Sequence, residues 1–73
     1  MAELKEIIFV VEEDAEGGFT ARALGESIFT EAATMDELRT AIRDALKCHF
    51  NTEVDIPRII RLHHVHDEVL LYA

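Results

Sequence analysis

The sequence predicts a two-layer α+β domain: an antiparallel three-stranded meander, one helix, and then one or two C-terminal strands. Three observations support this prediction. Short β-rich runs separated by glycine-containing turns fill the first 32 positions, the hydrophobic period then changes from 2 to 3.6, and β-rich composition returns after Pro57. With 73 residues the chain has the length of one small domain, so we expect a single domain over residues 1–73.

The first strand is expected where five β-branched and aromatic residues follow one another. Alternation places Ile7, Phe9 and Val11 on one face of this strand, and Ile8 and Val10 on the other. Both faces are therefore apolar, and one helix can cover only one of them. We expect a second copy of the protein to cover the face with Ile8 and Val10.

Two glycine-containing turns separate the three strands of the predicted meander. Gly17 and Gly18 end a polar segment, and glycine supplies the positive φ that tight hairpin turns need. Alternation resumes over residues 19–24, Gly25 and Glu26 form a second turn, and residues 27–32 read as the third strand.

A helix is predicted over residues 34–50. Thr34 and Glu37 fit the capping box that marks a helix start. One face has apolar spacing of three and four, formed by Leu38, Ala41, Ile42, Ala45, Leu46 and His49. Asn51 and Pro57 end the helix.

A fourth strand is expected over residues 58–66, then a turn or bulge at 66–68 and a short terminal strand over 69–72.

The charge balance excludes several classes of partner. Fifteen acidic residues oppose seven basic ones, which gives a formal net charge of −8. Such a chain repels phosphate backbones and anionic membranes, so we expect no direct binding of DNA or RNA and no membrane partner. Apolar runs are too short for a membrane span, and the first residues lack the pattern of a signal peptide, which together predict a cytoplasmic protein.

Four acidic residues cluster where the first predicted strand ends, namely Glu12, Glu13, Asp14 and Glu16. A solvated hairpin is one interpretation, and a magnesium site or a pair of catalytic carboxylates is another, although alternation would splay these side chains apart. The third interpretation is a negative patch that attracts a basic protein. We take these four residues as the candidate partner-binding site.

The histidines of the C-terminal region could bind a metal ion. On a strand His64 and His66 point the same way, and His49, Asp67 or Glu68 is available as a third ligand. The alternative is that these amphipathic side chains line the rim of a half-buried sheet. We expect no metal and no cofactor, and if a metal is bound, His64, His66 and Asp67 are its ligands.

No motif indicates an enzyme. Cys48 and His49 are neighbours on the predicted helix, so their side chains diverge, and a single cysteine permits neither an internal disulfide nor a zinc site made of cysteines. The glycine pair has neither the spacing nor the following helix of a phosphate-binding loop.

The stretch Glu12–Ala21, which contains Gly17-Gly18-Phe19-Thr20-Ala21, together with Thr34-Met35-Asp36-Glu37-Leu38 resembles the HicB-like antitoxin domain. The resemblance covers residues 7–50. It departs from the family's pattern in the loop Leu24-Gly25-Glu26-Ser27 and in Ala32-Ala33, which precede the helix.

The resemblance implies a truncated ribonuclease-H-like βββαβ fold without catalytic carboxylates, which acts by binding. Such domains mask a small basic ribonuclease toxin, form homodimers or homotetramers, and in complete systems use a separate C-terminal segment to bind DNA. We expect no such DNA-binding tail after Tyr72. The sequence thus leaves three candidate functions: an antitoxin-like binding module, a stand-alone homo-oligomeric interaction or scaffold protein without a toxin, and a small metal-binding protein.

Overall fold

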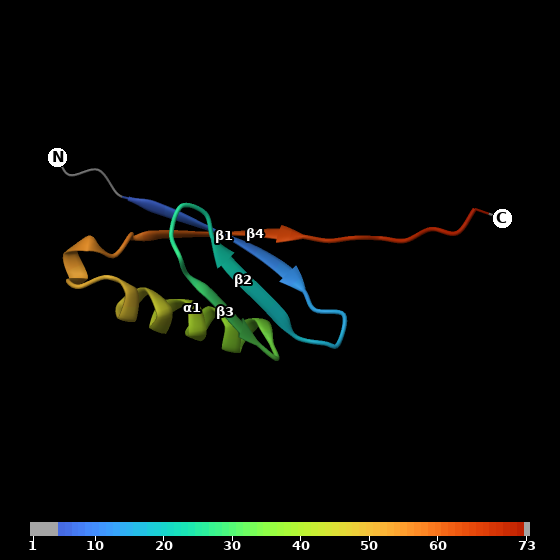
Figure 1. Ribbon diagram of the computed structural model, residues 1–73, viewed down its shortest axis with the longest axis horizontal. Coiled ribbons are helices and arrows are strands. Elements are labelled where there is room, and N and C mark those ends of the chain that lie inside the picture. The colour runs from blue at the N-terminus through green and yellow to red at the C-terminus, as the bar shows by residue number, and fades with distance from the viewer. Residues whose placement is uncertain (1–4, 73) are drawn as a thin grey trace.

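The computed structural model describes residues 5–72 and confirms the βββαβ order (Figure 1). The described elements are strands β1 (Glu6–Glu13), β2 (Phe19–Ala23) and β3 (Phe29–Ala32), helix α1 (Met35–His49), the 3₁₀ turn η1 (Glu53–Asp55) and strand β4 (Ile59–Val65). Residues 1–4 and 73, which the single-domain prediction includes, lie outside the described residues. No helix in the described part of the chain is long and apolar enough to cross a bilayer.

The four strands form one mixed sheet in the order β3-β2-β1-β4. β1 pairs antiparallel with β2, and β2 pairs antiparallel with β3, as expected for a meander. β4 pairs parallel with β1, so that Phe9 lies between Ala23 of β2 and Leu62 of β4. Because α1 and η1 connect β3 to β4, the chain crosses from one edge of the sheet to the other.

α1 covers one face of the sheet and builds the core there. The buried side chains of this core are Ile7, Phe9, Val11, Ala21, Ala23, Ile28, Leu38, Ile42 and Leu46. The helix packs against β3 and β2 rather than centrally over the sheet (Figure 1). Ile60 and Leu62 of β4 are therefore only half-buried, although they point to the same face.

The start of α1 matches the prediction. Thr34 is the N-cap, and its Oγ1 accepts a hydrogen bond from the Glu37 backbone N–H at 3.1 Å. The hydrogen bonds of residues 5–72 do not include the return bond of a full capping box. At the other end His49 is exposed and does not lie in the buried apolar face of the helix, where we expected it. Its Nε2 lies 3.0 Å from Oε2 of Glu26 at the rim of the core.

Two boundaries differ from the predicted ones. β3 begins at Phe29 rather than at residue 27, because the Ile28 N–H donates to the Glu26 carbonyl within the preceding turn. β4 ends at Val65, and the expected short strand over residues 69–72 is not formed in the described structure. β1 ends at Glu13, so no described strand of the same chain extends beside the C-terminal residues, which continue outward as an extended segment (Figure 1).

Candidate functional site

β1 and β4 finish at the same end of the sheet (Figure 1), and exposed carboxylates gather there. We call this region the acidic end and define it by Glu12, Glu13, Asp14, Glu16, Glu31 and Asp67, all of which are exposed. The segments 12–21, 29–34 and 62–72 that form it contain no lysine or arginine. This end of the sheet thus carries six exposed carboxylates, and Arg22 lies two residues beyond Thr20 on the face that Glu12 and Glu31 share.

The sheet register sets the spacing of these carboxylates. Glu12 and Glu31 both pair with Thr20, one from each side, so both lie on the face opposite α1. They are two strands apart, which corresponds to about 10 Å. Glu13 follows Glu12 along β1 and therefore points to the other face. The carboxylates surround the end of the sheet and do not converge on one point.

A tight turn between β1 and β2 fixes this arrangement. The Asp14 N–H donates to the Gly18 carbonyl at 3.0 Å, and the Gly17 N–H donates to the Asp14 carbonyl at 3.0 Å. The Glu16 N–H donates to Oδ1 of Asp14 at 3.1 Å. Gly17 and Gly18 have φ values of 99° and 86°, in the left-handed region that favours glycine. The glycine pair therefore has a structural role in closing the turn.

Two groups of residues predicted separately lie together in the structure. Glu12, Glu13 and Asp14 line a shallow hollow that is bounded on its other side by residues at the end of β4, namely Val65, His66 and Asp67. His64 lies nearby and lines a neighbouring depression with Glu13 and His66. Glu16 lies further along the turn and lines a separate depression with Glu31. The parallel pairing of β1 with β4, which brings these groups together, was not part of the sequence prediction.

The histidines do not form a metal centre among the described residues. Across residues 5–72 no group of three or more His, Cys, Asp or Glu side chains could hold a metal ion. His64 belongs to β4, but the strand ends one residue later, so its pairing does not fix His66.

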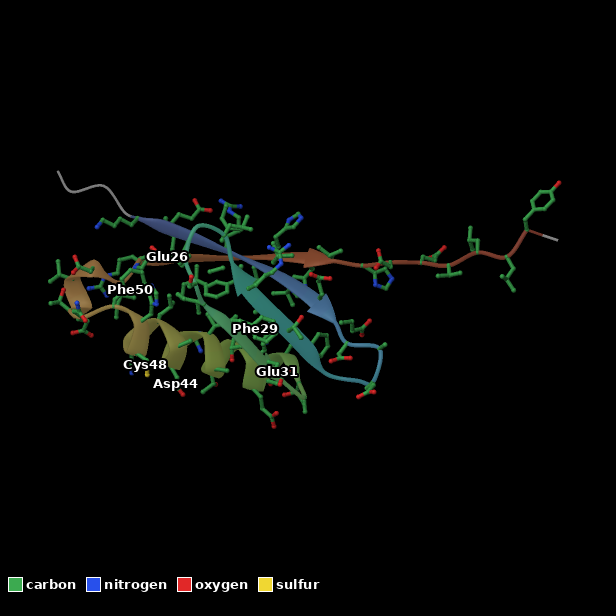
Figure 2. All side chains as sticks on the ribbon, in the orientation of Figure 1. Glu26, Phe29, Glu31, Asp44, Cys48 and Phe50 are labelled. Atoms are coloured by element: carbon green, nitrogen blue, oxygen red, sulfur yellow. The ribbon has the colours of Figure 1, made fainter. Side chains whose placement is uncertain are left out.

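Cys48 is isolated from the groups that would activate it. The thiol is exposed on the surface of α1 that faces away from the sheet (Figure 2). The ring of the adjacent His49 interacts with Glu26 instead. The two side chains therefore diverge as their spacing on a helix predicts.

The face of the sheet opposite α1 has a different surface from the one expected. Ile8 and Val10 lie on this face, but Ile8 is half-buried and Val10 is only 8% exposed. Arg22 and His63 flank Val10 in the register of the sheet and shield it. Phe29, which pairs with Arg22 and is 64% exposed, is the large apolar side chain that the sequence reasoning missed (Figure 2). Because successive side chains of a strand point to opposite faces, Phe29 is expected on the face opposite that of Ile28, and this alternation could have identified it.

An ion pair on the same face connects β1 with β4. Arg61 donates from Nε to Oε1 of Glu6, a contact between exposed side chains. The hydrogen bond from Arg61, assisted by its charge, lowers the pKa of Glu6 below its ordinary value of 4.5. The same contact raises the pKa of Arg61.

Comparison with known proteins identifies two relatives. The chain is 54% identical over 44 residues to a UPF0150 protein of Archaeoglobus fulgidus, a match that covers 60% of this chain and 65% of the relative. It is 45% identical over 47 residues to a UPF0150 protein of Thermotoga maritima, covering 64% of this chain and 67% of the relative. No family model and no solved structure matches the chain. The relatives' name states no activity, and no comparison confirms the resemblance to HicB-like antitoxins. On the strength of these two relatives, the chain belongs to the UPF0150 family.

Proposed function

We propose that the protein is a non-catalytic binding module whose acidic end docks a small basic protein, in the manner of a HicB-type antitoxin that masks a ribonuclease toxin. The observation that supports this proposal is the acidic end itself, where six carboxylates from β1, the β1–β2 turn, β3 and Asp67 after β4 are exposed. Potentials of this kind attract partners of opposite charge and favour the matching orientation.

The spacing of the carboxylates favours a macromolecular partner over a small cation. A magnesium or calcium ion requires several oxygens within about 2.6 Å of one point. Glu12 and Glu31 are separated by about two strand spacings, or 10 Å, and Glu13 points to the opposite face. Lysine and arginine side chains distributed over a protein surface can reach carboxylates at such distances from one another, whereas one ion cannot.

Purification of the tagged chain from its own cells tests the proposal. We expect a short basic protein to co-purify, and its binding to be measurable by calorimetry. The double variant Glu12→Gln/Glu13→Gln removes two charges from the acidic end with little change in side-chain size. We expect it to weaken binding by about 10-fold or more, since close charge pairs across interfaces contribute at least about 1.5 kcal/mol in favourable cases.

A matched control separates position from total charge. Asp44→Asn/Glu53→Gln changes the net charge by the same two units, at exposed residues of α1 and η1 away from the acidic end. We expect this control to change the dissociation constant by less than about three-fold, because exposed charges more than about 10 Å from an interface are screened. The proposal fails if no basic protein is captured, or if both double variants weaken binding equally.

A second candidate function is a stand-alone homo-oligomeric interaction protein without a toxin. The observation that favours it is the amount of exposed apolar surface. Phe29 is 64% exposed, and Val69, Leu70, Leu71 and Tyr72 are each at least 82% exposed. The molar mass of the purified protein by light scattering tests it: an 8.3 kDa monomer at micromolar concentration would contradict it.

A further inference from the structure

We propose that two copies of the protein pair by exchanging their C-terminal segments, so that residues 66–72 of each copy lie antiparallel along the outer edge of β4 of the other. The two sheets then continue into one another through their β4 strands. This inference rests on self-association, the second candidate function, and specifies its surface.

His66 and Asp67 of the exchanged segment line the hollow beside Glu12 and Glu13, and beyond them the segment extends away from the rest of its chain (Figure 1). After Val65 the chain runs straight past the β1–β2 turn, and the molecule reaches 57 Å along this direction against 24 and 20 Å across it (Figure 1). Val69, Leu70, Leu71 and Tyr72 are each more than four-fifths exposed. Four consecutive apolar residues of this size in contact with water indicate a surface that is covered in the functional state.

The outer edge of β4 has the properties of a receiving strand. β4 is the last strand of the sheet, so its outward N–H and C=O groups have no partner strand within residues 5–72. It is seven residues long and contains no proline or glycine, whereas β3 at the other edge has four residues. Long regular edges of this kind readily accept an additional strand.

An apolar groove runs beside this edge. Because α1 packs over β3 and β2, a cavity remains between the helix and β4, lined by Ile42, Ile60 and Leu62 with Arg39 and Arg43. Ile60 and Leu62 are half-buried at its floor. In the described part of the chain, the groove therefore lacks an apolar cover on the side from which a new strand would approach.

The residue pattern selects one register. A two-fold axis perpendicular to the sheet keeps the helix on the same face in both copies, so helix-facing residues must meet helix-facing residues. Pairing centred on His66 places Leu70 opposite Leu62, and Tyr72 opposite Ile60, with both incoming side chains beside the groove. It also places Glu68 opposite His64, a pair that can hydrogen-bond across the strands. Shifting the pairing by two residues in one direction would put Glu68 opposite Leu62, and shifting it in the other would leave Ile60 without a partner among the described residues. Only the register centred on His66 therefore gives both Leu62 and Ile60 an apolar partner.

The same contacts within one chain would require a hairpin at residues 64–68. The sequence there, His64-Val65-His66-Asp67-Glu68, contains no glycine, asparagine or proline. Tight hairpins need residues with positive φ, and no described non-glycine residue of the structure has one. The extended backbone thus favours exchange between copies, which forms these contacts without the turn.

The first test compares two adjacent substitutions. We expect the wild-type protein to be a dimer by light scattering, with twice the mass of the 8.3 kDa chain. Leu70→Lys puts a positive charge into a groove already lined by Arg39 and Arg43, and is expected to weaken the dimer by about 100-fold because the new charge is desolvated next to like charges. Leu71→Lys is the matched control: the residue is similarly exposed in the single chain but points to the other face, toward the exposed Arg61 of the partner, which is paired with Glu6. We expect it to change the dissociation constant by less than about three-fold.

The second test traps the register with a disulfide. In a Cys48→Ser background, His63→Cys and Val69→Cys are made in separate chains, which are then mixed and oxidised. The proposed register places these residues directly opposite each other, at a Cα separation of about 4.5–5.5 Å that suits a disulfide. We expect cross-linked pairs of one chain of each kind. Mixing the Val69→Cys chain with chains that retain the native Cys48, on the far side of α1, should give none.

The outcomes separate the exchange from its alternatives. A monomeric wild type overturns both the exchange and self-association. A dimer that tolerates Leu70→Lys as well as Leu71→Lys leaves self-association standing but overturns the exchange, and then points to the face with Ile8 and Val10. An internal disulfide in monomers carrying both His63→Cys and Val69→Cys shows a hairpin within one chain and also overturns it. Capture of a basic toxin-like partner is an independent result.

Discussion

Gly18 illustrates how one residue position fixes the geometry of the acidic end. Its φ of 86° is unfavourable for any residue with a side chain. A Cβ atom at this position would also lie 2.8 Å from the carbonyl oxygen of Ala32, at the end of β3. Gly18 is therefore required twice, once for the turn and once for the close approach of β3 to the hairpin.

Gly18→Ala should destabilise the protein more than Gly25→Ala does. Gly25 has the same φ of 86°, but a Cβ atom there would meet nothing within 4 Å, so this variant reports the conformational cost alone. That cost is about 1–2 kcal/mol. The backbone clash at Gly18 should add at least about 1 kcal/mol, measured by urea unfolding at one fixed protein concentration. Equal destabilisation of the two variants would show that the contact with Ala32 has no energetic effect.

At the scale of elements, the pairing of β4 with β1 is the contact that the sequence predicts least well. The pairing is parallel and depends on a crossover of more than twenty residues through α1 and η1. Glu6 and Arg61 connect the two strands on the face without a helix. Since the pKa of Glu6 is lowered in the folded protein, the pair stabilises the fold when Glu6 is ionised.

The contribution of this pair should depend on pH in a defined direction. The folded-state pKa of Glu6 lies below the ordinary 4.5, so its stabilisation is present above pH 4.5 and is lost as the pH falls through the folded-state value. Glu6→Gln should therefore be less stable than wild type at pH 7 and equally stable at acidic pH. Both side chains are exposed, so the difference at pH 7 should also shrink in high salt. A difference that persists at acidic pH would mean that Glu6 acts by packing and not by its charge.

The elements were predictable from the sequence where local interactions decide them. Thr34 and Glu37 mark the start of α1, and Gly17 and Gly18 mark the first turn, because capping and turn geometry involve neighbours in the chain. The parallel partner of β4 was not predictable, because pairing across a long crossover leaves no local pattern. For the same reason the meeting of Glu12 and Glu13 with His66 and Asp67 became visible only in the structure.

The expected strand over residues 69–72 shows a second reason why the structure differs from the sequence prediction. Its apolar composition is typical of a strand, but the structure forms no strand there. A strand also needs a neighbour, and β1 ends at Glu13, before the chain reaches Val69. Composition alone does not reveal whether that neighbour belongs to the same chain.

On the scale of the whole molecule, the net charge of −8 opposes the meeting of two copies. The proposed exchange centres on His66, which lies beside the hollow lined by Glu12, Glu13 and Asp14. The acidic ends of both copies therefore approach each other at the two-fold axis. Apolar contacts of the exchanged segments must exceed this repulsion for the dimer to form.

Salt should consequently strengthen the dimer. Raising sodium chloride from about 10 mM to about 300 mM shortens the Debye length from about 30 Å to below 8 Å and screens the repulsion. We expect the dimer dissociation constant from sedimentation to fall at least about three-fold, as screening of like charges predicts. A dissociation constant that rises with salt would indicate an interface formed by ion pairs, contrary to an interface centred on apolar residues.

Charge is also distributed unevenly along the strands of one copy. Lys5 and Arg58 precede β1 and β4 at one end of the sheet, where Glu6, Glu26 and Asp55 line a hollow with Lys5, whereas six exposed carboxylates define the acidic end. The negative charge of a single chain is therefore least compensated at the acidic end. In an exchanged pair the two acidic ends lie at the centre, so the negative potential of the pair is strongest there. A basic partner would then be drawn to the middle of the pair, where one partner molecule could contact both copies at once.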